Sequence, residues 1–232
     1  MIKVIGADER YHMELPWLSS YWHFSFDQYY DPANMGWGAL RVFNDDLIMP
    51  GGGFEMHEHR DMEIITCVLE GTLQHQDSEG NQAAIQANEV QVMSAGRGIT
   101  HSERNQSLTQ QAHLLQIWII PRKRGGTPRW EQKAFGVEAK TGRLVPVVSD
   151  GSIEGTLAID QDAEVYLSKM LAGKPLLHAM RPGRKAYVFT ISGRALVNGW
   201  ELNAGDQARI DGVSKLTLEA PVDSEVIVLD VP

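Results

Sequence analysis

The chain has 232 residues, of which 43% are apolar and 22% are charged. These values are typical of a globular protein and exclude a disordered chain. With 21 basic and 30 acidic side chains the net charge is −9, and because an acidic surface repels a phosphate backbone, direct nucleic-acid binding is not expected.

No apolar run approaches the ~20 residues that a membrane helix needs. The strongest candidate, residues 114–120, is interrupted by Gln116. The first 16 residues hold Asp8, Glu9 and Glu14 where a signal peptide needs an apolar stretch. The single cysteine, Cys67, permits no internal disulfide. We therefore expect a cytoplasmic protein without a membrane segment.

Short β-rich segments recur along the chain, and few segments keep a helical apolar period. They cover residues 39–43, 63–69, 89–93, 113–120, 186–191, 216–218 and 226–231. Turn sequences separate them, such as PGGG at 50–53, DSEGN at 77–81 and NG at 198–199. Many short strands with turns at this spacing predict an all-β chain of antiparallel strands, arranged as barrels or sandwiches.

The two halves of the chain resemble each other. Residues 68–73 (VLEGTL) are echoed by residues 191–196 (ISGRAL), and each segment is followed by a hairpin signal. Such a repeat predicts a duplicated β-barrel. Residues 121–135 contain prolines, paired glycines and local charge, as expected of a connection. We therefore predict an N-terminal barrel over residues 1–125 and a C-terminal barrel over residues 126–232.

Two of the histidine-containing motifs stand apart from the other histidines. His57 and His59 are two residues apart after a glycine-rich turn, and His101 and Glu103 repeat this spacing. Residues i and i+2 of a strand project from the same face, so two such strands side by side supply three nitrogen ligands and one oxygen ligand. That set suits a divalent first-row metal and leaves coordination positions open for substrate or oxygen. The alternative is two unrelated surface pairs.

The spacing of these residues resembles the two sequence motifs of the cupin superfamily. The first motif matches Gly51, His57, His59 and Glu63, and the second matches Gly96, Gly98, His101 and Asn105, with Gly96 where cupins usually carry proline. More narrowly, the chain resembles the pirin family in the segments WHFSF (22–26), YDP (30–32), HEHRDME (57–63), LEG (69–71) and SAGRGITHSE (94–103). The resemblance is dense over residues 17–120 and sparse but collinear beyond them.

The resemblance implies a metal site in the N-terminal barrel. Carried over from pirins, the metal ligands are His57, His59, His101 and Glu103. The wider cupin pattern uses the glutamate of the first motif instead, here Glu63, which strand parity also directs inward. We prefer Glu103 because the H-x-E motif is intact, so that Glu63 is either a supporting or a structural acid.

The second repeat differs at the corresponding positions. It carries Ala179 and Arg181 where the first repeat has His57 and His59. We therefore expect the C-terminal barrel to lack metal ligands, and we expect His178, one position out of register, at the surface or at an interface.

The resemblance also implies a bicupin, with two antiparallel jelly-roll barrels, and a quercetinase activity. Short bacterial pirin-like proteins are described as quercetin 2,3-dioxygenases, which cleave flavonols with insertion of O2 and release of carbon monoxide. Glu103 would be the catalytic base that accepts a substrate proton. The resemblance favours iron(II) as the cofactor, with zinc, copper, nickel, cobalt and manganese left open.

The expected partners are a planar aromatic substrate and O2, bound by a monomer. Seven aromatic residues between positions 17 and 30 either pack between the barrels or line a pocket for such a substrate. The alternative function is a non-enzymatic, iron-containing regulator that binds a protein partner, because pirins are also described in this way. A third hypothesis for the function is a cupin isomerase or a protein that binds a small molecule without reaction, since one fold hosts many functions.

Overall fold

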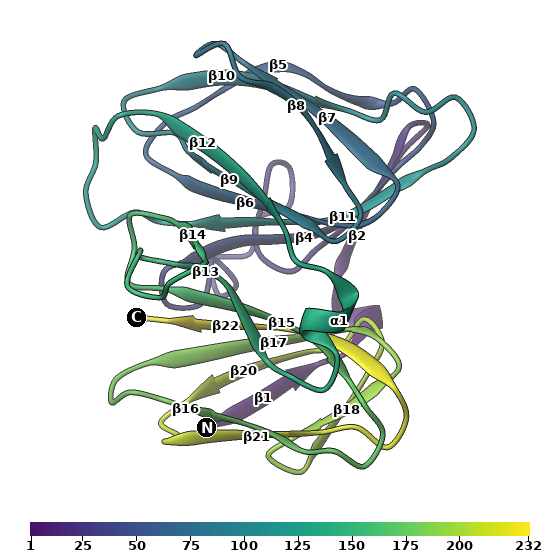
Figure 1. The fold of residues 1–232 in the computed structure, drawn as a ribbon, viewed down its shortest axis with the longest axis vertical. Helices are drawn as coiled ribbons and strands as arrows, with labels where there is room; N and C mark the ends of the chain where they lie inside the picture. The colour runs from purple at the N-terminus through teal and green to yellow at the C-terminus, as the bar shows by residue number, and fades with distance from the viewer. The chain divides into compact units, whose positions relative to one another are not determined.

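The computed structural model describes residues 1–232, and the chain is built almost entirely of strands (Figure 1). Its helices are a 3₁₀ turn (Ala7–Glu9) and one short α-helix, α1 (Val137–Lys140). Neither has the length and apolar character needed to cross a membrane. We call the two compact units of the chain the N-terminal unit (Tyr11–Phe135 and Leu157–Gln161) and the C-terminal unit (Met1–Arg10, Gly136–Thr156 and Asp162–Pro232).

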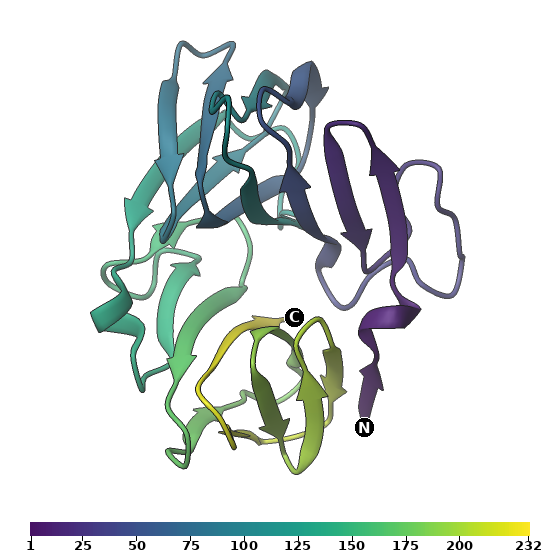
Figure 2. The same ribbon diagram turned by 90° about the vertical axis from the view of Figure 1, so that its right-hand side faces the viewer.

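The N-terminal unit contains two antiparallel sheets. The larger sheet has, in spatial order, β12 (Arg129–Ala134), β9 (Glu89–Ser94), β6 (Glu63–Glu70), β11 (Ala112–Ile119), β4 (Leu40–Ile48), β3 (Leu18–Trp22) and β2 (Tyr11–Leu15). The smaller sheet has the order β5 (Gly53–His59), β10 (Ile99–Arg104), β7 (Thr72–Asp77) and β8 (Gln82–Gln86). The β2–β3 hairpin ends the larger sheet, and Figure 2 shows it in dark purple.

The C-terminal unit repeats this arrangement. Its larger sheet contains β1 (Ile2–Ile5), β20 (Gln207–Asp211), β17 (Lys185–Ser192), β22 (Ser224–Val231), β15 (Glu164–Met170) and β13 (Val145–Ser149). Its smaller sheet has the order β16 (Leu176–Ala179), β21 (Lys215–Glu219), β18 (Arg194–Val197) and β19 (Trp200–Asn203). A two-residue strand, β14 (Leu157–Ala158), lies in the segment Leu157–Gln161, which is part of the N-terminal unit. Two antiparallel barrels of this kind confirm the predicted all-β architecture.

Equivalent glycines mark the repeat. Gly71 precedes β7 and Gly193 precedes β18, with φ angles of 74° and 75°. A Cβ atom would lie 2.5 Å from the Gln111 carbonyl oxygen in the first case and 2.6 Å from the Asp223 carbonyl oxygen in the second. Both turns therefore require glycine, which explains why the two halves resemble each other at this point in the sequence.

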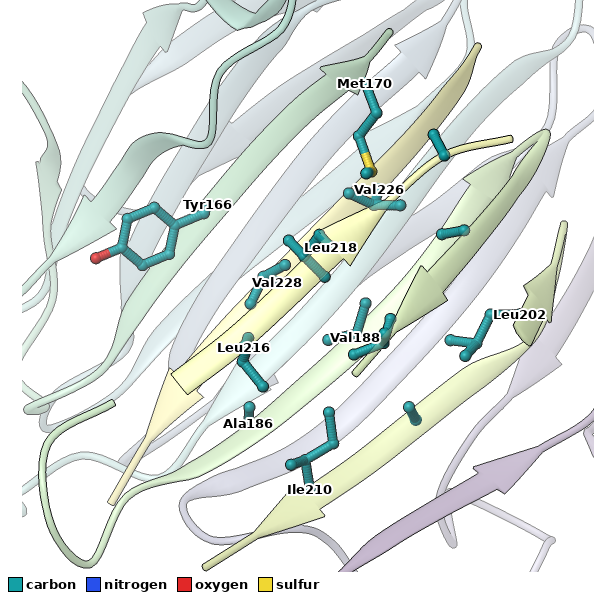
Figure 3. Close-up of a cluster of buried hydrophobic side chains, with 14 of the residues drawn as sticks. Tyr166, Met170, Ala186, Val188, Leu202, Ile210, Leu216, Leu218, Val226 and Val228 are labelled. Carbon is teal, nitrogen blue, oxygen red and sulfur yellow. The ribbon is translucent and has the colours of Figure 1, made fainter. Parts of the chain in front are cut away.

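The interiors of the two units differ in polarity. In the C-terminal unit, alternate residues of the strands bury an apolar cluster that includes Val188, Leu216 and Val228 (Figure 3). The N-terminal unit also has apolar clusters, but it buries in addition the polar side chains of Thr66, His75, Gln91, His101 and Glu103. Buried polar groups are retained only where they have partners or a function, so this interior is where a site is expected.

The predicted domain boundaries differ from those of the two compact units at the start of the chain and after residue 125. Ile2–Ile5 pairs with β20 and so belongs to the C-terminal unit. Arg129–Ala134, expected in the connection, forms β12 and pairs with β9 of the N-terminal unit. Both pairings join strands that are far apart in the sequence. The local composition of a segment does not indicate such a distant partner.

Candidate metal centre

The two histidine motifs lie on neighbouring antiparallel strands, β5 and β10. His57 is directly opposite His101 in the register, and His59 is opposite Ile99. The imidazole ring centroids are 4.4 Å apart for His57 and His101, 4.9 Å for His59 and His101, and 4.7 Å for His57 and His59. The potential ligand atoms of these three side chains all lie within 4.8 Å of one another. The predicted convergence of the motifs is therefore present.

The hydrogen bonds of His57 and His101 each leave one ring nitrogen without a protein partner. His57 Nδ1 donates to the carbonyl oxygen of Glu55 at 2.7 Å, so its Nε2 is the unprotonated nitrogen. His101 Nε2 is buried and has no hydrogen-bond partner. An orphaned buried nitrogen beside two other imidazoles needs an explanation, and a metal ion supplies one. The three histidines thus fit a divalent cation.

Burial keeps these imidazoles in the form that binds metals. Burial, with a smaller effect of His57, lowers the pKa of His59 to about 4. Burial lowers the pKa of His101 further, to about 2, and the neighbouring histidines act in the same direction. Both rings are therefore neutral near pH 7, and a neutral imidazole is the ligand that a transition metal requires.

A chain of hydrogen bonds supports His101 from the side opposite Nε2. His101 Nδ1 lies 3.5 Å from Nδ1 of His75, and His75 Nε2 lies 3.2 Å from the carboxylate of Asp77. The backbone N–H groups of Glu79 and Asn81 also donate to Asp77. An ionised Asp77 only accepts, so His75 Nε2 donates, His75 Nδ1 accepts and His101 Nδ1 donates. This order leaves the lone pair of His101 on Nε2.

Glu103 lies beside His101 on β10 and is 2% exposed. Its carboxylate accepts hydrogen bonds from Gln116 Nε2 at 2.8 Å and from Thr66 Oγ1 at 3.3 Å. Its oxygens lie within 4.8 Å of the ligand atoms of His101 and His75, a different group from that of His57 and His59. Burial raises the pKa of Glu103 to about 7, against the opposing effect of the Thr66 hydrogen bond.

The residues that hold Glu103 come from the facing sheet. Thr66 on β6 and Gln116 on β11 are paired in the register, and Thr66 Oγ1 also lies 3.0 Å from Gln116 Oε1, so its single hydroxyl proton is shared between this oxygen and the Glu103 carboxylate. Thr66 was not among the residues predicted from the sequence, and Gln116 was noted there as the residue that interrupts the apolar run 114–120. That interruption is the available signal, because a glutamine within a buried strand needs a partner.

Glu63, the alternative carboxylate, lies elsewhere. It is 3% exposed, accepts a hydrogen bond from Ser94 Oγ at 2.6 Å, and lines a separate cavity of about 340 Å³ with Arg129 and Asp160. Strand parity fails because the chain bends at Asp61 (φ 51°), which ends β5 in one sheet before β6 starts in the other. The expectation that parity directs Glu63 towards the histidines is wrong.

A cavity of about 550 Å³ adjoins the histidines. Its apolar lining includes Trp22, Phe26, Phe54 and Trp118, and its polar lining includes His57, His59, Glu103, Gln116, Ser20, Asn44 and Asp46. Two of the aromatic residues between positions 17 and 30 therefore line this cavity. Flat apolar walls beside a cluster of metal-ligating groups are suited to an aromatic ligand.

Comparisons with known proteins place the chain in a family. A family model described as "Pirin" matches residues 6–119, and one described as "Quercetinase C-terminal cupin domain" matches residues 146–231. A relative from Escherichia coli K12 named quercetin 2,3-dioxygenase is 44% identical over 232 residues, which is 100% of this chain and 99% of that protein. The chain belongs to the pirin family.

Two further pirin relatives extend the comparison. A pirin-like protein from Caulobacter vibrioides is 43% identical over 98% of this chain and 96% of its own length. A crystal structure of the bacterial pirin YhhW from Escherichia coli, in complex with nickel(II), superposes with a TM-score of 0.95 at 42% identity, covering 100% of this chain and 99% of that one. The relatives thus span the whole chain and both of its units.

The C-terminal unit of this pirin carries a cluster of titratable groups formed by Glu164, His178 and Asp230. His178 Nε2 lies 2.8 Å from Asp230, and Arg184 also pairs with Asp230, while Arg181 pairs with Glu164. The two guanidinium groups already supply the positive charge that these carboxylates need. His178 is 9% exposed and its ring packs against Tyr166, so the surface position expected for it is wrong, whereas the alternative position at an interface stays a prediction.

Proposed function

We propose that the chain is a metal-dependent dioxygenase that cleaves flavonols such as quercetin, inserting O2 and releasing carbon monoxide. The observation that carries the proposal is the cavity of about 550 Å³, in which aromatic side chains adjoin three convergent histidines and a buried carboxylate. Relatives at 44% identity that are named quercetin 2,3-dioxygenase support the same activity.

In this proposal His57, His59 and His101 hold a divalent metal, and Glu103 completes the ligand set. The nickel(II) complex of the relative supports a divalent ion. Iron(II) is our proposal for the native metal, and nickel, zinc, copper, cobalt and manganese are the alternatives to be tested. When bound, the ion supplies Lewis acidity that lowers the pKa of a hydroxyl group bound to it.

The protein's own groups orient the substrate and move its proton. Trp22, Phe26 and Trp118 provide flat apolar walls for the fused rings and exclude water from them. Glu103 accepts the proton of the flavonol 3-hydroxyl group. Thr66 and Gln116 fix the Glu103 carboxylate by hydrogen bonds, so its orientation does not have to be established during the reaction.

The activity is tested by the decay of quercetin absorbance under oxygen. Protein reconstituted separately with each candidate metal is compared with His101→Ala, which is expected to lose the metal. Decay that depends on the metal, with release of carbon monoxide, is the expected result. No decay with any metal, despite bound metal, would reject flavonols as substrates and favour the regulator that binds a protein partner.

The role of Glu103 is tested by a matched pair of substitutions. Glu103→Gln keeps the shape of the side chain but cannot accept the proton, so we expect turnover to fall by about 100-fold or more. Glu63→Gln is the control, because Glu63 lines a different cavity, and it should leave turnover unchanged. Equal turnover in the Glu103→Gln variant and the unmodified protein would remove Glu103 as the base.

A further inference from the structure

The cavity has a second polar region, formed by Ser20 on β3 with Asn44 and Asp46 on β4. In the register Ser20 is opposite Asp46, and Asn44 is opposite Trp22. All three polar side chains line the cavity and are 1%, 4% and 2% exposed, respectively. None of them belongs to the metal centre or to the proton transfer proposed above.

Asn44 carries an unused hydrogen-bond acceptor. Its buried side-chain oxygen has no partner in the structure. Leaving a buried polar atom without a partner is costly, and such atoms are rare in folded proteins. On its own sheet Asn44 is flanked by Gln116, whose Oε1 lies beside Thr66 and whose Nε2 donates to Glu103, and no hydrogen bond joins Gln116 to the side-chain oxygen of Asn44. The acceptor of Asn44 is therefore available to a molecule in the cavity.

Asp46 adds a second acceptor beside it. The hydroxyl group of Ser20 donates to Asp46, and no other side chain hydrogen-bonds to this carboxylate. No arginine or lysine lines the cavity. A wall that offers acceptors without cations favours a ligand with hydroxyl donors and disfavours a carboxylate or a phosphate.

We propose that Asn44 and Asp46 form a subsite that binds ring hydroxyl groups of the substrate other than the hydroxyl group that lies at the histidines. The inference rests on the proposed function and adds to it the residues that recognise the ring hydroxyl groups of the substrate. The aromatic side chains of the cavity favour a flat ring system. Among flat ring systems, the acceptors of Asn44 and Asp46 favour those with additional phenolic hydroxyl groups.

The test is the affinity of nickel(II)-loaded protein for two flavonols in the absence of O2, measured by absorbance titration. Quercetin carries ring hydroxyl groups in addition to its 3-hydroxyl, and 3-hydroxyflavone carries only the latter. We expect the protein to bind quercetin about tenfold more tightly, as one to two hydrogen bonds allow. In Asn44→Leu and Asp46→Asn this preference should fall severalfold, with 3-hydroxyflavone affinity unchanged.

The controls separate this subsite from the proposed function. Asn203→Leu makes the same substitution at an exposed position of the C-terminal unit and should keep the preference. Nickel content and unfolding temperature establish that each variant is folded. Equal affinity of the unmodified protein for both flavonols, or a preference that survives both substitutions, overturns the subsite alone. Binding of neither flavonol overturns the flavonol function together with the subsite.

Discussion

His101 shows how one side chain connects the metal centre to the barrel interior. Its Nε2 lies with His57 and His59, and its Nδ1 is opposite His75, which in turn contacts Asp77. Partners of this kind fix the orientation and the tautomer of a metal-ligating histidine and raise its basicity. His75 is fully buried and stacks on Trp130, so its own position is fixed by packing.

We therefore predict that His75→Phe weakens metal binding although the three histidines remain. The substitution keeps a flat ring but removes the acceptor for His101, and we expect the metal affinity to fall by about 10- to 100-fold. Competition with a chromogenic chelator measures it. His12→Phe, at an exposed histidine of β2, is the matched control. Unchanged affinity in His75→Phe would show that His101 does not depend on this chain of hydrogen bonds.

The sequence predicted that the two residues of each histidine motif lie on one face, because this depends on local periodicity. Positions 57 and 59 share a face, as do positions 101 and 103, whatever the rest of the fold is. The support by Thr66 and Gln116 was not predictable in the same way, because it depends on the register between β6 and β11. That the metal ligands are His57, His59, His101 and Glu103 stays a prediction.

At the scale of elements, the pairing of β5 with β10 brings the histidine motifs together. The register shifts between His101 and Glu103, where Glu103 is opposite Phe54 and Arg104 is opposite Gly53. Gly53 allows the close approach of the two strands, since a Cβ atom there would lie 2.5 Å from both the Cα of Arg104 and the carbonyl oxygen of Glu103. Backbone atoms cannot move aside as a flexible side chain can.

Gly53→Ala should therefore separate β5 from β10 and disturb the histidine group. We expect a loss of about 1–3 kcal/mol of unfolding free energy, as for overpacking, together with weaker metal binding. Urea unfolding and chelator competition measure the two effects. Gly126→Ala is the control, because a Cβ atom at Gly126 meets no atom within 4 Å. Equal stability of the two variants would show that the strands adjust without cost.

Some of the strands were predictable, and the failure to predict β12 has a physical reason. The predicted segments 63–69, 186–191 and 226–231 lie within β6, β17 and β22, and the predicted segment 39–43 starts one residue before β4. These strands are rich in buried β-branched and aromatic residues, which local sequence reveals. β12 was missed because its sequence, RWEQKA, is mostly polar, with only Trp130 and Gln132 half-buried, so its pairing with β9 leaves little apolar signal.

At the scale of the whole molecule, the two units have the same strand order but differ in the side chains that their smaller sheets place in the interior. The N-terminal unit has histidines on its smaller sheet, whereas β16 and β21 of the C-terminal unit contribute Leu176, Leu216 and Leu218 to an apolar core. In a duplicated barrel one copy is sufficient to hold a functional site, and the interior of the other copy can then be filled with apolar side chains. The C-terminal unit also buries polar side chains, among them the cluster around Asp230.

Asp230 should make the stability of the C-terminal unit sensitive to acid. It is 1% exposed, and although burial raises its pKa, hydrogen bonds from His178 and Arg184 lower it more, so the pKa lies below its ordinary value of 3.8. A carboxylate with a depressed pKa contributes its full stability above the pKa of the unfolded chain and loses it as the pH falls through the folded value. The contribution is thus complete at pH 7 and is lost below about pH 4.

We predict that Asp230→Asn lowers the unfolding free energy by about 3–5 kcal/mol at pH 7, because it removes the buried carboxylate that pairs with the guanidinium of Arg184 and leaves only the more exposed Asp162 beside it. The difference from the unmodified protein should shrink as the pH falls below about 4, since the unmodified Asp230 is then protonated as well. Thermal unfolding between pH 7 and pH 3 measures both effects. Asp8→Asn, at an exposed residue of the same unit, should change stability by no more than about 0.5 kcal/mol. Equal unfolding temperatures of Asp230→Asn and the unmodified protein at pH 7 would show that this buried ion pair adds nothing to the stability of the unit.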